Sequence, residues 1–456
     1  MNQNDSSPEL NRREFLKGGS FSTLMMMMGG IPLTAPAADG DGSIDASQAA
    51  KVVRCGVIGC GIWGREILNT LAQLPGANVV AVCDTYEAFL NRAKRAAPNA
   101  EGYEDYRALL ANPDVEAVIV ATPSHQHREI ALAAMAAGKH VYCEAPLATS
   151  IDDARAIARA ARDSVRVNFQ SGLQMRSDPQ RHFLVDFIRA GALGRTVKGR
   201  GQWHKKQSWR RVSPTPEREH ELNWRLRRET SPGLMGEIGI HQLDVFDWFF
   251  LLRPSAVTGF GNVLHWRDGR EVADTIQAVF EYPQGVRFNY EATLVNSFDA
   301  DYEMFYGSDA AVMLRKNKAW MFKEVDAPLL GWEVYARKDT FYEETGIALV
   351  ANATQLVAQG ENPVEEAPFT NTPLFYSLEA FLANSYAHAA AVEDFTSLFG
   401  SGDNDALADY LKDLAGTKMP AAGFLEGFEA TVTALKANEA ISRGERLTFE
   451  DQWYEI

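Results

Sequence analysis

Short apolar runs alternate with amphipathic stretches along the chain from residue 51 to residue 169. The apolar runs are rich in aliphatic side chains and cover residues 52–58, 78–83, 115–121, 138–144 and 165–169. The stretches between them include helical spacing at 106–111, 130–137 and 151–162. Continuous apolar runs are typical of strands buried on both faces, and their alternation with helices indicates βαβ units. Residues 51–169 are therefore predicted to form an α/β domain with a parallel sheet.

The pattern changes after residue 170. Helical spacing appears at 183–190 and 237–250, and a period-two alternation of apolar and polar residues follows. The alternation predicts strands at 256–266, 274–282, 286–295, 302–307, 312–315 and 319–324, with a hairpin turn at 283–285. Residues 170–443 are thus predicted to form an α+β domain with a large, mainly antiparallel open sheet. Within it, 325–420 is predicted to be a helical extension and 424–443 the last helix, ahead of a tail at 444–456.

A glycine motif follows the first predicted strand. Gly59, Gly61 and Gly64 enclose Cys60 and the pair Ile62-Trp63, and a helical pattern comes next. The first glycine makes a tight turn, the second lets the backbone approach a pyrophosphate, and the third allows helix–strand contact. Asp84 ends the second strand, 20 residues past Gly64, where a carboxylate accepts from a ribose hydroxyl. The motif predicts a Rossmann domain that binds NAD rather than NADP; a glycine turn in an ordinary βαβ unit is the alternative.

Other polar residues end the later strands of this sheet. Thr122, Pro123 and His127 follow the strand at 115–121, and Glu144 ends the strand at 138–144. Because ligands of such sheets lie outside the carboxyl ends of the strands, these four residues are predicted to line the cofactor site. Loop packing is an equal interpretation for His127, and a structural role is the alternative to a nicotinamide-ribose contact for Glu144.

Composition narrows the possible functions. The chain has 456 residues, 46% of them hydrophobic, and a formal net charge of −15. The length suits two or three domains, and the net negative charge argues against nucleic-acid partners. Four cysteines are too few for a disulfide scaffold and lie in or beside the parallel strands, so buried reduced thiols are expected. No metal site is predicted.

The first 37 residues have the pattern of an export signal. Arg12 and Arg13 precede a moderately apolar stretch that ends at residue 33, and small residues follow at 35–37. The paired arginines favour the twin-arginine export machinery, which predicts a periplasmic or otherwise exported protein without this segment. The stretch is too short to span a bilayer, so no stable membrane anchor is expected. Residues 38–50 are predicted to be a linker; a disordered tail with two chance arginines is the alternative to the signal.

The order and spacing of the motifs resemble the Gfo/Idh/MocA family, the group of glucose–fructose oxidoreductase and inositol dehydrogenase. The resemblance spans about residues 51–325 and the last helix, and its motifs are Gly59-x-Gly61-x-x-Gly64, Thr122-Pro123-Ser124-x-x-His127, Glu144-x-Pro146 and Glu237-x-x-x-His241-x-x-Asp244. It implies a Rossmann domain, a substrate domain whose open sheet often mediates homo-oligomers, NAD(P), and sugar or polyol substrates. Two departures stand out. Ala145 replaces the family's strand-end lysine, and Glu237 replaces its catalytic aspartate.

Candidate catalytic residues come from the last of these motifs. Glu237 and His241 are four residues apart, so they are expected to share a helix face, where the carboxylate can orient the imidazole as a base. The resemblance favours catalysis by His241; a buried structural histidine is the alternative from the residues alone. Asp244 is expected to be a structural hydrogen-bonding group. Arg176 and Arg225 occupy positions that are often substrate-facing in the family, and Trp224 beside Arg225 is expected to stack on a sugar ring.

One segment of the acidic chain is strongly basic. Residues 195–228 contain eleven basic residues and three acidic ones, with tryptophans at 203, 209 and 224 between them. Basic groups next to aromatic faces suit a carboxylated or sulfated sugar, and the segment is expected beside the substrate. A solvated loop or a subunit interface is the alternative.

Three functions satisfy these expectations. The first is an exported NAD-dependent oxidoreductase acting on a sugar, polyol or glycoside, with a tightly bound cofactor recycled in each cycle because no ready NAD pool exists outside the cytoplasm. The second is an NAD-dependent glycosidase or lyase that cleaves by transient sugar oxidation and elimination, which the absence of lysine at Ala145 favours. The third is a sugar-binding protein that retains NAD without catalysis.

Overall fold

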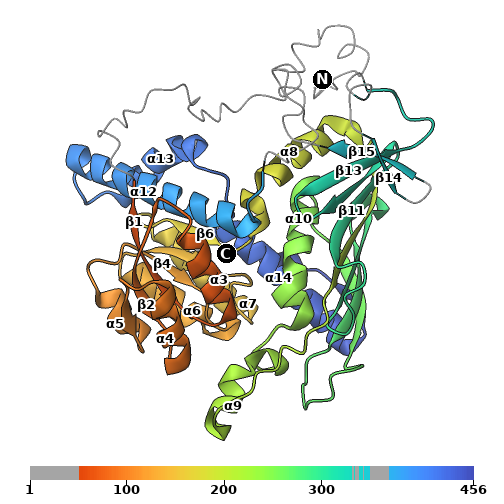
Figure 1. The fold of residues 1–456 in the computed structure, drawn as a ribbon. Helices are drawn as coiled ribbons and strands as arrows, with labels where there is room; N and C mark the ends of the chain where they lie inside the picture. The colour runs from red at the N-terminus through yellow and green to blue at the C-terminus, as the bar shows by residue number, and fades with distance from the viewer. Residues whose placement is uncertain (1–50, 331–332, 334–337, 342–343, 350–368) are drawn as a thin grey trace. The chain divides into compact units, whose positions relative to one another are not determined.

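The computed structural model describes residues 51–330, 333, 338–341, 344–349 and 369–456 (Figure 1). The predicted signal at 1–37 and linker at 38–50 lie outside the described residues. The chain from Ala50 to Ile456 forms one compact unit. Two sheets organise this unit, the parallel sheet A and the mainly antiparallel sheet B.

Sheet A is the parallel sheet predicted for the first domain. Its six strands are β1 (Val53–Ile58), β2 (Ala77–Cys83), β3 (Glu101–Tyr103), β4 (Ala117–Val120), β5 (His140–Cys143) and β6 (Phe169–Ser171), in the order β3-β2-β1-β4-β5-β6, all parallel. The intervening helices are α3 (Ile62–Leu71), α4 (Glu87–Ala96), α5 (Tyr106–Ala111), α6 (His127–Ala136) and α7 (Ile151–Asp163). The prediction of an α/β Rossmann domain with a parallel sheet is confirmed, although β6 begins at the end of the predicted strand.

The apolar runs form these strands because both faces of sheet A are covered. Val57, Ile119 and Tyr142 are completely buried. All four cysteines are buried and free, as expected. Burial raises the pKa of the Cys55 thiol to about 12, so this thiol stays protonated at neutral pH.

Sheet B confirms the prediction of a large, mainly antiparallel sheet. Its strands are β7 (Thr196–His204), β8 (Ala256–Asn262), β9 (Thr275–Glu281), β10 (Arg287–Thr293), β11 (Asp301–Gly307), β12 (Ala310–Arg315), β13 (Lys318–Lys323), β14 (Lys338–Phe341), β15 (Glu344–Leu349) and β16 (Leu447–Thr448). The order is β14-β15-β13-β12-β11-β7-β10-β9-β8-β16, and only the β7–β10 pair is parallel. The helical prediction for 325–420 is wrong at β14 and β15, which extend one edge of the sheet.

Strand β7 lies inside sheet B but has no clear strand pattern. Its Gly199 and Gly201 face α10 (Ile240–Phe250), and a Cβ at Gly199 would lie 2.3 Å from the Phe246 ring. The helix packs so closely that only glycine fits there. The alternation of apolar and polar side chains that marks a strand is therefore missing.

The C-terminal helices return to the nucleotide domain. Helix α12 (Pro373–Phe399) buries Leu378 and Phe381 against the core of sheet A, where the Phe381 ring meets Tyr142 edge to face at 5.6 Å. Helix α13 (Asn404–Asp413) follows, and α14 (Phe424–Arg443) has the predicted bounds and packs on both α7 and β8. Two shorter helices, α8 (Pro179–Phe187) and α9 (Pro216–Leu222), flank β7 in the sequence.

Candidate active site at the carboxyl edge of sheet A

Two glycines of the motif are required by the fold itself. Gly59 has φ +92°, and a Cβ there would lie 2.6 Å from the backbone of Ala121. A Cβ on Gly64 would lie 1.9 Å from the carbonyl oxygen of Gly59. These residues hold the β1–α3 turn tightly against the loop after β4.

Gly61 differs from its two neighbours in the motif. Its backbone is extended, with φ −63°, and a Cβ there would meet nothing within 4 Å. Neither backbone strain nor packing requires glycine here. The open space lies at the N-terminus of α3, where backbone N–H groups favour an anion. The loop therefore fits the pyrophosphate of a dinucleotide.

Asp84 is fixed at the end of β2 beside this loop. Its Oδ2 accepts from the Cys60 N–H at 2.8 Å and its Oδ1 accepts from the Tyr86 N–H at 2.7 Å. Burial raises the pKa of the Asp84 carboxyl, and these two hydrogen bonds oppose the rise. The carboxylate is only half-buried and keeps free lone pairs, so it suits the ribose hydroxyl for which it was predicted.

Trp63 and Glu144 meet across the same edge. The Trp63 indole N–H donates to Glu144 Oε1 at 2.8 Å, which joins the glycine loop to the end of β5. Burial raises the pKa of the Glu144 carboxyl to about 7, while Trp63 and Arg225 lower it. Glu144 is therefore an acid poised to gain or lose a proton near neutral pH.

Glu237 forms the centre of a second polar cluster. It lies in the π-helical turn Met235–Gly239, with one carboxylate oxygen accepting from Ser124 Oγ at 2.8 Å and the other from Arg225 Nε at 3.0 Å. The Arg225 guanidinium also lies over the Trp224 ring, 4.7 Å from its centroid. Ser124 was not predicted as a site residue, although it stands inside the Thr122-Pro123-Ser124 motif.

His241 lies in the first turn of α10 but is not paired with Glu237. No hydrogen bond joins the two in the described part of the chain, where the Nδ1 atom of His241 is buried and has no partner. The expected carboxylate–imidazole pair is wrong because a π-helical turn shifts the side-chain faces that a regular helix aligns at four-residue spacing. Burial, with the charge of Arg181, lowers the pKa of His241 to about 4, so the ring is neutral at physiological pH.

Profiles of two known domains match the chain. The NAD-binding Rossmann fold of the oxidoreductase family matches residues 53–171, and the GFO/IDH/MocA C-terminal domain matches residues 183–312. Together they cover more than half of the chain. The chain belongs to the Gfo/Idh/MocA oxidoreductase family. Its first domain is thus an NAD-binding domain, in agreement with the geometry of the glycine loop.

Individual members of the family are similar over part of the sequence. Inositol 2-dehydrogenase of Salmonella paratyphi B is 30% identical over 198 residues, 43% of this chain and 54% of that protein. A glycosyl hydrolase family 109 protein of Shewanella baltica is 28% identical over 230 residues, 44% of this chain and 50% of that protein. The chain thus spans about half the length of the curated relatives it matches. The solved structure of levoglucosan dehydrogenase in complex with NADH shares the fold, with a TM-score of 0.64 and 19% identity over 88% of this chain and all of that one.

Two predicted site residues of this Gfo/Idh/MocA protein have structural roles instead. Both ring nitrogens of His127 face backbone carbonyls, those of Pro146 at 2.9 Å and Thr122 at 3.0 Å, in a fully buried position. His127 thus packs the loop of Thr122 and Pro123 against the end of β5, which favours the loop-packing alternative. Arg176 donates three hydrogen bonds to the buried Asp244 and is therefore not free to face a substrate. Asp244 has the structural role predicted for it.

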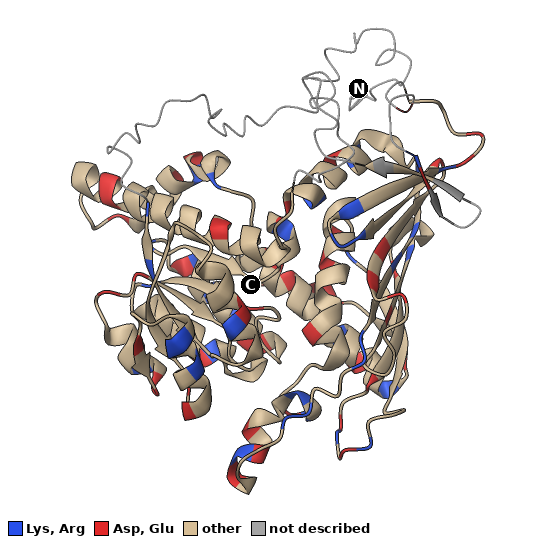
Figure 2. Cartoon of the chain, in the orientation of Figure 1, with Lys and Arg blue, Asp and Glu red and all other residues tan. Residues whose placement is uncertain are grey.

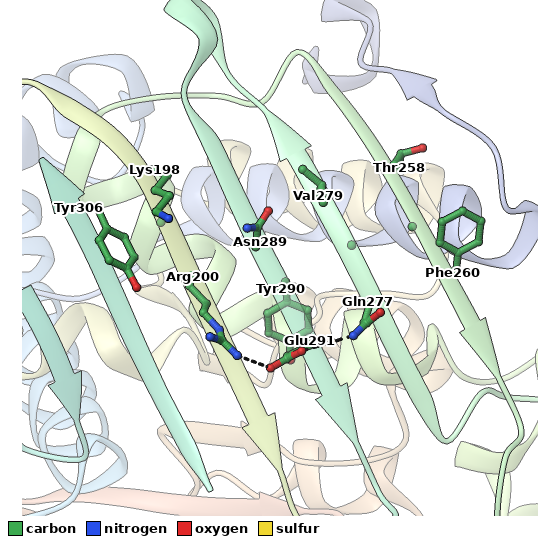
Figure 3. Close-up of a pocket in the computed structure, with 13 residues that line it drawn as sticks. Lys198, Arg200, Thr258, Phe260, Gln277, Val279, Asn289, Tyr290, Glu291 and Tyr306 are labelled. Carbon is green, nitrogen blue, oxygen red and sulfur yellow. Dashed lines mark hydrogen bonds and ion pairs between the residues drawn. The ribbon is translucent and has the colours of Figure 1, made fainter. Parts of the chain in front are cut away.

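The basic segment 195–228 does not form one surface. Lys198 and Arg200 belong to β7 and point away from α10, into a depression on the other face of sheet B, where Arg200 pairs with Glu291 at 2.7 Å (Figure 3). Only the part after β7 approaches sheet A. The prediction that this segment lies beside the substrate is therefore wrong for Lys198 and Arg200. Homo-oligomerisation through the face with the depression stays a prediction.

Two features are absent from the residues that the structure describes. Within them, no group of three or more histidine, cysteine, aspartate or glutamate side chains is arranged to hold a metal ion. None of their helices combines the length and the apolar character needed to cross a bilayer.

Glu144→Gln is expected to remove a pH-dependent loss of stability. The folded carboxyl keeps its proton up to about pH 7, whereas the unfolded one releases it near 4.5, so the stability of the wild-type protein falls as pH rises through this window. The glutamine keeps an acceptor for Trp63 without the charge. The variant should match the wild type at pH 4.5 and exceed it by up to about 3 kcal/mol at pH 8. Urea unfolding of NAD-free protein measures this, with the exposed Glu393→Gln as control. A constant difference across this pH range would contradict it.

Proposed function

We propose that this protein is an NAD-dependent oxidoreductase that acts on a carbinol carbon of a sugar, polyol or glycoside. One observation carries the proposal. The open space at Gly61, which suits a pyrophosphate, lies at the same edge of sheet A as the polar contacts of Glu144 and Glu237. The names of the relatives agree with this substrate class, since inositol 2-dehydrogenase and levoglucosan dehydrogenase are among them.

Each side chain of the site has a separate role in the proposed oxidation. Bound NAD supplies the hydride acceptor. His241, neutral above about pH 4 and with a free Nδ1, takes the hydroxyl proton. Trp224 offers an aromatic face to a sugar ring. Glu237 holds Arg225 in place and has its own carboxylate fixed by Ser124.

Arg225 takes the place of the missing strand-end lysine as the cation of the site. It pairs with Glu237, and its charge lowers the pKa of Glu144, so it is close to both acids. Lys205 and Lys206 are the lysines that could have replaced the missing one, but they are exposed beyond the end of β7. A guanidinium donates hydrogen bonds but does not give up its proton near neutral pH. Arg225 therefore polarises the substrate oxygen, and the proton goes to another group.

Redox-neutral cleavage of a glycoside is the second candidate function. The glycosyl hydrolase family 109 relative and the absence of lysine at Ala145 support it. In this reaction the sugar carbon is oxidised, the activated neighbouring C–H is lost with the aglycone, water adds and the ketone is reduced again. The same site residues serve both reactions, because both begin by oxidising a hydroxyl.

Export by the twin-arginine route is part of the proposal. Arg12 and Arg13 in the N-terminal signal pattern support it. That route carries folded proteins, so the cofactor would enter in the cytoplasm and remain bound outside it. A binding protein that retains NAD without turning over a sugar is the third reading.

A panel of free sugars, polyols and nitrophenyl glycosides tests these readings on the purified holoprotein. The oxidoreductase reading predicts an oxidised sugar, together with NADH or a second, reduced sugar. Release of nitrophenol without net NADH would favour cleavage instead. Tight sugar binding with neither product would favour the binding protein.

A further inference from the structure

Residues 205–231 leave sheet B after β7 and reach the NAD-binding domain at the loop after β2. Arg218, on α9, donates from Nη2 to the Thr85 carbonyl oxygen at 2.6 Å and from Nη1 to Thr85 Oγ1 at 3.4 Å. Its guanidinium also lies 5.4 Å from the centroid of the Tyr86 ring. Thr85 and Tyr86 directly follow Asp84, the predicted ribose ligand. Arg218 therefore ties α9 to the ribose end of the cofactor groove.

The same segment also contacts the loop after β4. The Trp224 ring lies 6.1 Å from the His125 ring, and Arg225 shares Glu237 with Ser124. These contacts lie on the other side of β1, because β1 stands between β2 and β4 in sheet A. The segment thus spans the glycine loop at the end of β1.

The segment also carries a cation, Arg211, whose backbone is held within the segment itself. Asn223 is buried and holds the backbone of Arg211 from both sides, accepting from its N–H at 2.7 Å and donating to its carbonyl at 3.0 Å. Partial burial lowers the pKa of Arg211, and the charges of Arg225 and of Arg65, which directly follows Gly64, lower it further. Among the described residues, the Arg211 side chain has no hydrogen-bond acceptor, so it is available to the pyrophosphate.

We propose that residues 205–231 form a cover over bound NAD, fastened by Arg218 beside the adenosine ribose. A dinucleotide on this fold lies across the ends of the strands on either side of β1, which are the places the segment bridges. In Figure 2 the ribbon of α9 is coloured for both acidic and basic residues, and Glu221 on this helix pairs with Arg218 at 3.1 Å. Arg218 is thus held in position for its contact with Thr85, and NAD leaves only after that contact breaks.

Arg218→Gln tests the cover without any substrate. NAD release is followed by the loss of NADH fluorescence when loaded protein is mixed with excess NAD. The variant should release NADH about tenfold faster than the wild type, because bonds from a charged donor are among the stronger ones. Arg228→Gln is the matched control, since Arg228 lies in the same segment but donates to Glu271. It should release NADH at the wild-type rate.

A release rate for Arg218→Gln within twofold of the wild type, with a normal melting temperature, would overturn the proposal. Limited trypsin digestion of the wild-type protein gives a second test that needs no variant. NAD should protect the bonds after Arg210 and Arg211, and equal cleavage with and without NAD would also overturn it. Because neither test uses a sugar, failure of the cover is distinct from failure of the proposed oxidoreductase function.

Discussion

Replacing Gly61 with alanine should weaken NAD binding between about tenfold and hundredfold while leaving the protein folded. The methyl group would stand in the open space at the N-terminus of α3, where the pyrophosphate approaches the backbone. Overpacking a close contact costs about 1–3 kcal/mol, which corresponds to this loss of affinity. Folding stability should fall by only about 1 kcal/mol, which is the typical cost of replacing a favoured N-cap residue with alanine. Calorimetric titration with NAD and thermal unfolding measure the two effects.

Two other glycines make this prediction specific. Gly64→Ala should destabilise the fold itself, because its Cβ would lie 1.9 Å from the Gly59 carbonyl oxygen. Gly416→Ala should change neither property, because it also has open space but lies in the turn Ala415–Thr417, after α13. Unchanged NAD affinity in Gly61→Ala would show that the cofactor does not approach the backbone there.

His241→Ala should lower kcat by about 10²- to 10⁴-fold and leave NAD affinity unchanged. Losing a general base has an effect of this size, and His241 lies on α10 rather than in the glycine loop. The measurement is turnover of whichever sugar the substrate panel identifies, together with NAD titration. Because the pKa of His241 is about 4, the imidazole stays neutral and able to accept a proton down to about pH 5. Protonation of His241 should therefore not lower kcat above that pH.

His388 on α12 provides the matched control. It is also buried, with a pKa lowered to about 4, but its Nε2 contacts the Val165 carbonyl and it lies outside the candidate site. His388→Ala should lower the melting temperature and keep kcat within a few fold. Full turnover in His241→Ala with the fold intact would show that another group accepts the hydroxyl proton. Glu144, whose pKa is about 7, would then be the first candidate.

Features that depend on neighbouring residues were predictable from the sequence. The parallel strands form apolar runs because sheet A is covered on both faces, and the glycine motif is a local signal because Gly59 has a positive φ and Gly64 packs on the Gly59 carbonyl oxygen. The last helix, α14, has the predicted bounds because its amphipathic pattern and the capping glycines at both ends are local signals.

Features that depend on distant packing were not predictable. Strand β7 carries Gly199 and Gly201 because α10 presses on it, a contact that no local pattern reveals. The π-helical turn at Met235–Gly239 separates Glu237 from His241, and the spacing of apolar and polar residues in the sequence does not predict this turn. One partner of Glu237 is Ser124, more than a hundred residues away, and Arg176 pairs with Asp244, so the polar clusters follow from tertiary contacts.

The most direct test of the proposed oxidoreductase function is a measurement of hydride transfer in a single turnover. Holoprotein freed of signal and linker would be mixed with each sugar, polyol or glycoside of the panel, and absorbance at 340 nm would be followed before any product leaves. At least one carbohydrate is expected to reduce the bound NAD, and absorbance at 340 nm should rise far more slowly in His241→Ala. Absence of bound NAD, or of any rise at 340 nm with every carbohydrate that binds, would contradict it.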